Sequence, residues 1–381
     1  MRSSVIASAV VAAIVGFGGT LALIIAAAQA LGATQAQTAS WVTALCLAMF
    51  IATGFLSWRY KMPIITAWST PGLALIGAST GFTMQQGVGA FIVTAIAIII
   101  TGLVKPVSGL VSKIPASIAS GMLAGVLFAF LIGAARTIPV DPLFVLPLVL
   151  LFFVIRLFNP AMAVLAVLFG GILFAFLSGR VASVPDISLS TLTLIMPVFD
   201  TRAIIGIALP LYLVTMASQN LPGFAVLRAA GYEPPTAAAL QVTGLLSLLT
   251  APFGAHTSNM AAISAAICTG PDAHPDPAQR WLTGPFYALS YLILAIFGAS
   301  LVALFAVLPA PLIALVAGLA LIGAFANALT IALKNETERL AAVVTFAVTA
   351  SGISIAGIGA AFWALVAGLL VVAFDHAKKH I

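Results

Sequence analysis

Charge is the scarcest feature of this 381-residue sequence, which holds only 15 basic and 9 acidic residues. Charged residues form 6% of the chain and apolar residues 62%, whereas soluble domains carry about 25% charged residues. So few charges cannot cover a water-exposed surface, which excludes a soluble enzyme, a nucleic-acid-binding protein and a disordered chain. Because the apolar residues are spread along the whole length, the sequence predicts an all-α polytopic protein of the lipid bilayer.

Cysteine is also rare, and Cys46 and Cys268 both fall within apolar stretches. The sequence has no Cys-x-x-Cys pair, metal-ligand spacing, paired catalytic acids or phosphate-binding loop, so we expect no metal, no cofactor and no enzyme activity. All nine acidic residues map to predicted loops or helix ends. We therefore expect no buried carboxylate as a proton relay or cation ligand.

Turn signals and charges divide the chain into fourteen predicted membrane segments. They cover residues 5–28, 41–57, 63–80, 87–104, 115–134, 142–156, 160–178, 203–219, 236–251, 255–269, 281–306, 309–330, 340–352 and 357–374. We interpret the first as an uncleaved helix, although its small-residue end resembles a signal-peptide cleavage site.

The distribution of basic residues orients these segments. With the N-terminus in the cytoplasm, only Arg136, Arg180 and Arg202 fall outside. The other twelve are predicted on the inner side: Arg2, Arg59, Lys61, Lys105, Lys113, Arg156, Arg228, Arg280, Lys334, Arg339, Lys378 and Lys379. This asymmetry favours cytoplasmic N- and C-termini, because inner loops are enriched in Lys and Arg.

The stretch 181–202 reads as an external linker between two halves of seven segments each. Similar Pro-Ala starts at Pro115 and Pro309, and helix breaks near Pro71 and Gly254, indicate a duplication, with chance similarity as the alternative. An odd number of helices in each half makes the two repeats inverted in the membrane, as in many transporters.

Two polar, helix-breaking clusters occupy matching positions of the halves, Thr66–Gly72 and Ala251–Asn259. We predict that each break starts a half-helix whose N-terminal amides face the membrane midplane, so that the pair forms an anion site. A structural kink is the alternative for either cluster. A third cluster, Thr215–Asn220, offers Gln219 and Asn220 as hydrogen-bond donors, although Asn220 also suits a helix cap.

The candidate substrate-binding residues come from these clusters and from helix 1. Phe17 and Trp68 are predicted to stack on an aromatic ring, with apolar packing as the alternative, and Gly18 allows close backbone approach. His256, the one histidine within a predicted span, either carries a coupling proton or hydrogen-bonds as a neutral ring. The full set is Phe17, Gly18, Trp68, Ser69, Thr70, Pro71, Gly72, Ser218, Gln219, Gly254, His256, Thr257, Ser258 and Asn259.

At these residues the sequence resembles the benzoate:proton symporter family, of the BenE type. The most specific matches are Thr66–Gly72, Leu213–Asn220 with Pro222 and Gly223, Ala230–Tyr232, Ala273–Asp276 with Gln279–Trp281, and Gly357–Trp363. The resemblance covers nearly the whole chain. It implies the fold of nucleobase-ascorbate and sulfate permease transporters, with short extended stretches in helices 3 and 10 and, in many members, a homodimer.

The resemblance also implies two domains, each drawn from both halves. The core domain would comprise residues 1–113 and 203–307, and the gate domain residues 114–180 and 308–381, with 181–202 as the linker. Where the nucleobase branch carries glutamates in helices 8 and 10, this chain has Gln219 and Ala255. Their absence suits an anionic substrate, because like charges repel strongly in a low-dielectric pocket.

The sequence therefore predicts a bacterial inner-membrane transporter that imports benzoate or a similar small aromatic carboxylate, with a proton, by alternating access. The missing glutamates leave the proton pathway open among His256, the carboxyl group of the substrate, and no coupling. The alternatives for function are transport of another organic anion or a nucleobase, or an anion channel of the same fold.

Overall fold

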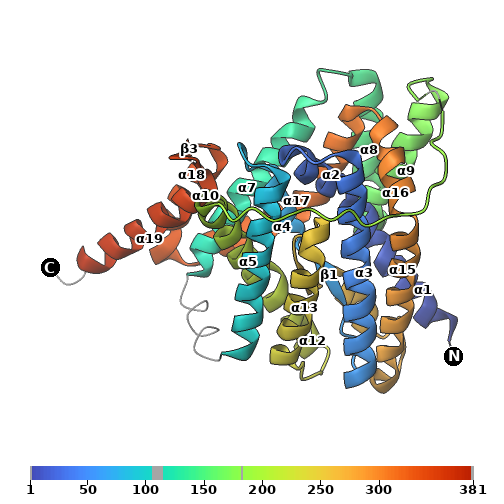
Figure 1. Cartoon of the computed structure of the whole chain (residues 1–381), viewed down its shortest axis with the longest axis horizontal. Coiled ribbons are helices and arrows are strands. Elements are labelled where there is room, and N and C mark those ends of the chain that lie inside the picture. The colour runs from blue at the N-terminus through green and yellow to red at the C-terminus, as the bar shows by residue number, and fades with distance from the viewer. Residues whose placement is uncertain (1, 105–114, 182, 379–381) are drawn as a thin grey trace.

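The computed structural model describes residues 2–104, 115–181 and 183–378, and most of them are helical (Figure 1). In the first half the elements are α1 (Ser3–Gly18), α2 (Leu21–Ala30), α3 (Gln35–Tyr60), β1 (Thr66–Trp68), α4 (Thr70–Gly77), α5 (Met84–Leu103), α7 (Ala116–Arg136), α8 (Pro142–Phe158) and α9 (Pro160–Leu177). Residues 183–200 form no regular element.

The second half begins with one long, irregular helix and ends with a hairpin and helix α19. Its elements are α10 (Thr201–Ala203), η1 (Ile204–Ala208), α11 (Leu209–Thr215), η2 (Met216–Asn220), α12 (Leu221–Ala229), α13 (Thr236–Thr250), η3 (Ala251–Phe253), β2 (Ser258–Met260), α14 (Ile263–Thr269), η4 (Pro277–Leu282), α15 (Thr283–Ile296), α16 (Gly298–Val307), α17 (Ala310–Lys334), η5 (Glu336–Glu338), α18 (Arg339–Ala350), β3 (Ser354–Ile355), β4 (Ile358–Gly359) and α19 (Ala360–Lys378).

Local sequence signals explain several helix starts. Thr34 with Gln37 forms a capping box at the start of α3, and Thr83 with Gln86 does so at α5, because each threonine accepts from the third helical amide. Pro115 and Pro309 precede α7 and α17 with nearly the same backbone angles, φ −55° and ψ 128° against φ −57° and ψ 131°. This likeness supports the predicted duplication of the two halves.

The eighth predicted segment is longer than expected. We predicted its end at residue 219, but the helix continues through Pro222 to Ala229. Two π-helical stretches, η1 and η2, interrupt it, and Pro222 lies in the first turn of α12 directly after η2. The wider turn shifts the hydrogen-bond register, so the missing proline N–H does not end the helix.

All fourteen predicted segments have a counterpart among these elements, but not all are single long helices. Within the described residues, seven helices are long and apolar enough to cross a membrane, or eight if α15 and α16, bent by 61°, count as one span. Shorter apolar helices, such as Pro142–Phe158, account for part of the remainder. A mostly helical, polytopic fold is confirmed, and the number of crossings stays a prediction.

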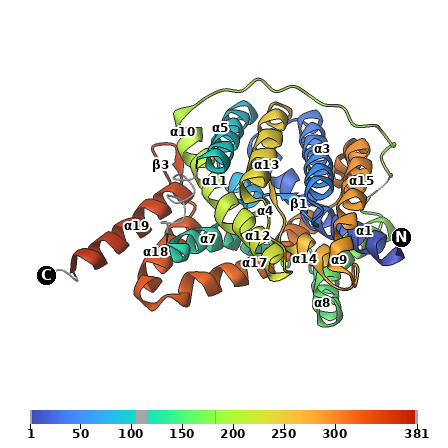
Figure 2. The ribbon, with the colours of Figure 1, turned by 90° about the horizontal axis from the view of Figure 1, so that it is seen from below.

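The helices pack in two sets. α3 packs most extensively on α15, and α5 on α13, whereas α7 packs mainly on α17 and α18. Figure 2 shows the segment 183–200 following the row formed by α15, α3, α13 and α5, and α19 projecting away from the rest of the chain. Lys105, Lys113, Lys379 and the predicted boundary at residues 113 and 114 lie outside the described residues.

Candidate functional site

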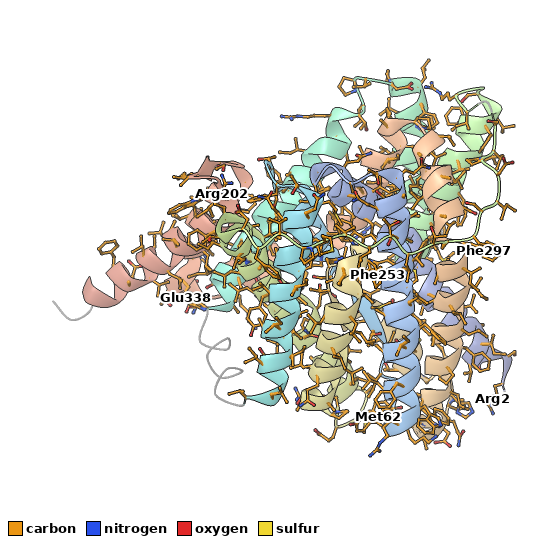
Figure 3. The ribbon with its side chains drawn as sticks, viewed as in Figure 1. Arg2, Met62, Arg202, Phe253, Phe297 and Glu338 are labelled. Carbon is orange, nitrogen blue, oxygen red and sulfur yellow. The ribbon has the colours of Figure 1, made fainter. Side chains whose placement is uncertain are left out.

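The two broken spans meet in a short antiparallel strand pair. β1 and β2 pair with Thr66 opposite Met260, Ala67 opposite Asn259 and Trp68 opposite Ser258. Figure 3 places Met62, four residues before β1, at one end of the molecule and Phe253, five residues before β2, near its middle. The extended stretches that the resemblance implied in helices 3 and 10 are thus confirmed.

The first break starts a half-helix as predicted. Ser69 caps α4, because its Oγ accepts from Gly72 N at 3.1 Å, and Pro71 fits the first turn because it has no N–H to leave unpaired. A Cβ added to Gly72 would lie 2.5 Å from Leu211 Cδ1 and 2.8 Å from Ser69 Oγ. A side chain at this position would therefore require both Leu211 and the Ser69 cap to shift.

The second break does not follow the prediction. We placed a half-helix N-terminus at His256–Asn259, but Ser258–Met260 is strand β2, and α14 begins only at Ile263. The left-handed Gly254, with φ 96°, ends η3 and turns the chain into this extended course. Ser258 N donates to Ser247 Oγ at 2.7 Å and Met260 N to Asn220 Oδ1 at 2.9 Å, while Asn259 pairs with Ala67 of β1. These residues are therefore held as a strand, and the expected pair of opposed helix N-termini is wrong.

His256 lies fully buried between α3 and the start of α4. Its Nδ1 accepts from Trp41 Nε1 at 3.2 Å, and its Nε2 lies 3.1 Å from the Ser69 carbonyl oxygen. The indole N–H is a donor only, so Nδ1 carries no proton, and Nε2 donates to the carbonyl. This is the neutral ring, hydrogen-bonded at both nitrogens, that we named as the alternative to a proton carrier.

Three buried hydroxyl groups connect α4, α11 and the second break. Thr215 Oγ1 donates to Ser69 Oγ at 3.0 Å and lies 3.4 Å from Thr257 Oγ1. Ser69 N also donates to the Thr257 carbonyl at 3.4 Å, which extends the strand pairing by one residue. These contacts hold the start of α4 against both the eighth and the tenth predicted segments.

The predicted aromatic pair is brought together, with a third ring. Phe17 packs edge-on against Trp68 with ring centroids 5.9 Å apart, and Tyr291 also packs edge-on against Trp68 at 5.7 Å. Trp68 Nε1 donates to Thr20 Oγ1 at 3.0 Å. Gly18 instead serves packing between helices, because an added Cβ would meet Leu165 of α9 at 2.5 Å.

The polar residues of η2 divide between two roles. Asn220 is buried, and its Oδ1 accepts from Met260 N at 2.9 Å, so it supports strand β2 from within a continuous helix and does not cap a helix end. Ser218 and Gln219 are half-buried, and neither side chain has a hydrogen-bond partner among the described residues. These two remain available to a ligand, as does the half-buried Thr70.

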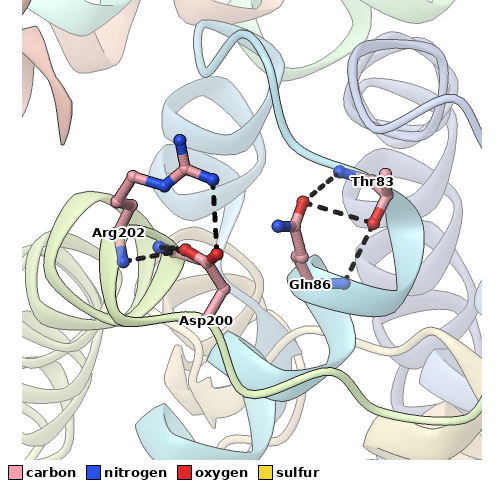
Figure 4. A network of polar contacts seen from close by, with 5 residues as sticks. Thr83, Gln86, Asp200 and Arg202 are labelled. Atoms are coloured by element: carbon pink, nitrogen blue, oxygen red, sulfur yellow. Dashed lines mark hydrogen bonds and ion pairs between the residues drawn. The ribbon is translucent and has the colours of Figure 1, made fainter. Parts of the chain in front are cut away.

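Two titratable groups outside the predicted membrane segments, Asp200 and Tyr232, have pKa values shifted by their surroundings. Asp200 caps α10 by accepting from Arg202 N and Ala203 N, and it pairs with the Arg202 guanidinium at 3.4 Å, beside the Thr83–Gln86 capping box (Figure 4). The hydrogen bond that Asp200 accepts from Ala203 N lowers the pKa of its carboxyl group. The hydrogen bonds and the positive charge of Arg202 lower it further. Burial raises the pKa of Tyr232, whose hydroxyl donates to the Pro277 carbonyl at 2.7 Å.

A cavity of about 180 Å³ lies away from this site, between α5 and the η1–α11 stretch. Apolar side chains line most of it, and the lining residue Thr94 donates its Oγ1 hydrogen to the Ala208 carbonyl at 3.2 Å. No predicted substrate-binding residue contributes to its walls, which are Val93, Thr94, Ala97, Ile204, Ala208, Leu209 and Tyr212. We therefore keep the strand pair as the candidate site.

Sequence reasoning missed Trp41, Thr215 and Tyr291. Trp41 lies 215 residues before its partner His256, and no motif connects them. Thr215 belongs to a cluster that we singled out, but only the fold brings its hydroxyl to Ser69. Tyr291 could have been noticed in the sequence, because Tyr287 lies four residues before it and the two therefore share one face of a helix. Their rings pack with centroids 4.8 Å apart.

The chain matches the family model described as benzoate membrane transport protein over residues 1–374. It is 35% identical over 361 residues to the Benzoate membrane transport protein of Acinetobacter baylyi (strain ATCC 33305 / BD413 / ADP1), covering 94% of this chain and 92% of that one. The chain belongs to this family. Members are membrane transporters and not enzymes, which confirms both of those predictions.

The chain is also similar to a second protein in sequence and to two solved structures in fold. The Inner membrane protein YdcO of Escherichia coli (strain K12) is 41% identical over 361 residues, or 94% of this chain and 92% of that one. The transmembrane domain of the cyanobacterial bicarbonate transporter BicA aligns with a TM-score of 0.63 at 17% identity, covering 98% of this chain and 97% of that one. SLC26A9 aligns with a TM-score of 0.69 at 12% identity, covering 98% and 66%.

Proposed function

We propose that this protein imports benzoate or a similar small aromatic carboxylate across the bacterial inner membrane, together with a proton. The observation that carries the proposal is the meeting of two broken spans at β1 and β2, with Thr70, Ser218 and Gln219 half-buried beside them. Interrupted spans that meet in this way are where transporters of this kind bind their substrates. The family supplies the substrate class.

The proposed carboxyl group binds beside the start of α4, and Gln219 supplies a polar contact. The proposed aromatic ring lies toward Phe17 and Trp68, which already contact each other edge-on. Trp41, His256 and Thr215 act through Ser69, because together they fix its carbonyl and hydroxyl oxygens. We therefore assign these three residues a positioning role.

Transport proceeds by movement of a core against a gate, with the boundaries predicted from the sequence. The preferred packing of α3 on α15 and α5 on α13, and of α7 on α17 and α18, supports this division. The linker gives independent support. Its Ser190 N donates to Ile296 O, Thr193 N to Ser40 Oγ and Ile195 N to Pro252 O, all within the proposed core.

Counterflow tests the carrier mechanism. Proteoliposomes loaded with unlabelled benzoate should take up labelled benzoate faster than empty ones, because an alternating-access carrier returns loaded faster than empty. A pore gives no such acceleration, and that result would favour the channel of the same fold.

Cytoplasmic termini and a homodimer stay predictions, which accessibility labelling at Arg2 and cross-linking would test.

A further inference from the structure

Two polar atoms on β2 are buried without a hydrogen-bond partner among the described residues, Ser258 Oγ and Asn259 Oδ1. Both side chains are at most 1% exposed. The Asn259 amide nitrogen donates one of its two N–H groups to the Met260 carbonyl at 3.0 Å. The amide oxygen can only accept a hydrogen bond, so any group that fills this unused position must be a hydrogen-bond donor.

The start of α4, by contrast, has few donors left. Pro71 has no N–H, Gly72 N donates to Ser69 Oγ, and Leu73 N donates to the Ser69 carbonyl. Of these first amides of the half-helix, only Thr70 N–H is left for a ligand. An anion at a helix N-terminus normally accepts from several amides at once. A carboxylate, which is an acceptor only, therefore fits this site less well than a group that also donates.

The described elements packed on β2 carry no aspartate or glutamate that could hold a proton for the substrate. As the structure describes them, β1, α13 and η2 carry no titratable side chain, α3 carries Cys46, Arg59 and Tyr60, and α12 carries Arg228. Arg59 and Arg228 are exposed near the ends of their helices. His256, just before β2, is hydrogen-bonded at both ring nitrogens and fully buried.

We propose that the site binds the carboxyl group in its neutral, protonated form, with the acid O–H donated to Asn259 Oδ1. The inference rests on the proposed function and assigns its coupling proton. Benzoate forms the O–H bond with a proton from water on the side where it binds, crosses as the neutral acid, and releases the proton to water on the other side. The substrate itself therefore carries the proton.

Two analogues separate this proposal from anion binding. Benzamide is neutral and presents one acceptor and one donor, like the acid, whereas benzenesulfonate is anionic and has no donor. We expect benzamide to compete with labelled benzoate uptake in proteoliposomes, and benzenesulfonate not to compete. From pH 6 to pH 7 the KM for total benzoate should rise about tenfold, since the neutral fraction falls tenfold per pH unit, while the inhibition constant of benzamide stays constant.

Competition by benzenesulfonate, or a failure of benzamide to compete, would overturn the proposal. Absence of saturable benzoate uptake by the unmodified protein would instead refute the proposed function, so the two failures are distinguishable. Asn259→Leu should weaken benzamide inhibition about tenfold, the loss expected for one hydrogen bond to a buried acceptor. Asn327→Leu, at an exposed position of α17, is the matched control. Unchanged inhibition in a folded Asn259→Leu protein would also overturn the proposal.

Discussion

Replacing Trp41 with Phe tests the contact that fixes His256. The substitution keeps a buried aromatic ring, which packs on Phe91 with centroids 5.4 Å apart, but removes the N–H that donates to His256 Nδ1. A buried acceptor left without its donor costs about 1–3 kcal/mol. The free energy of unfolding should fall by that amount, and the thermal midpoint by on the order of 5 °C.

The assay is thermal unfolding of the purified protein in detergent, with and without benzoate. Trp58→Phe is the matched control, because Trp58 lies on the same helix α3 but is 59% exposed. Its midpoint should stay unchanged. A double-mutant cycle of Trp41→Phe with His256→Leu should give a coupling of about 0.5–3 kcal/mol. A midpoint for Trp41→Phe equal to that of the unmodified protein would refute the reasoning.

Three further substitutions follow from the same contacts. Gly72→Ala should slow benzoate uptake in proteoliposomes while the protein still reaches the membrane, because the added Cβ lies 2.8 Å from Ser69 Oγ and disturbs the cap of α4; normal uptake would contradict the proposed close approach. His256→Gln should slow uptake but keep its response to a pH gradient, and loss of that response would restore His256 as the proton carrier. Asp200→Ala should lower the unfolding midpoint most at neutral pH and less in acid. The pKa of Asp200 is lower in the folded than in the unfolded protein, so the ionised carboxylate stabilises the fold above the unfolded-state pKa of about 3.9. This stabilisation is lost as the pH falls. A difference in midpoint between variant and unmodified protein that grows in acid would contradict this.

The first helix break could be predicted from the sequence because its cause is local. Ser69 is a good helix cap, and Pro71 two residues later suits the first turn of the helix that follows. The sequence also predicts the position of the second break, but the predicted helical start at residues 256–259 is wrong. Residues 258–260 are extended because β1 pairs with them, and that partner lies almost two hundred residues earlier.

The contacts that shape the site could not be predicted for a similar reason. Apolar content and turn signals predict where segments begin and end, but not which faces of them meet. Trp41 and Thr215 look like ordinary members of apolar helices, and only packing brings them to His256 and Ser69. At Asn220 the sequence predicts a helix end, but the π-helical stretch η2 lets the helix continue into α12.

Uptake of labelled benzoate into proteoliposomes under an imposed pH gradient tests the central claim most directly. The account predicts saturable uptake that is faster when the outside is acidic, and that unlabelled benzoate competes away. Uptake equal to that of protein-free liposomes at every gradient would contradict it.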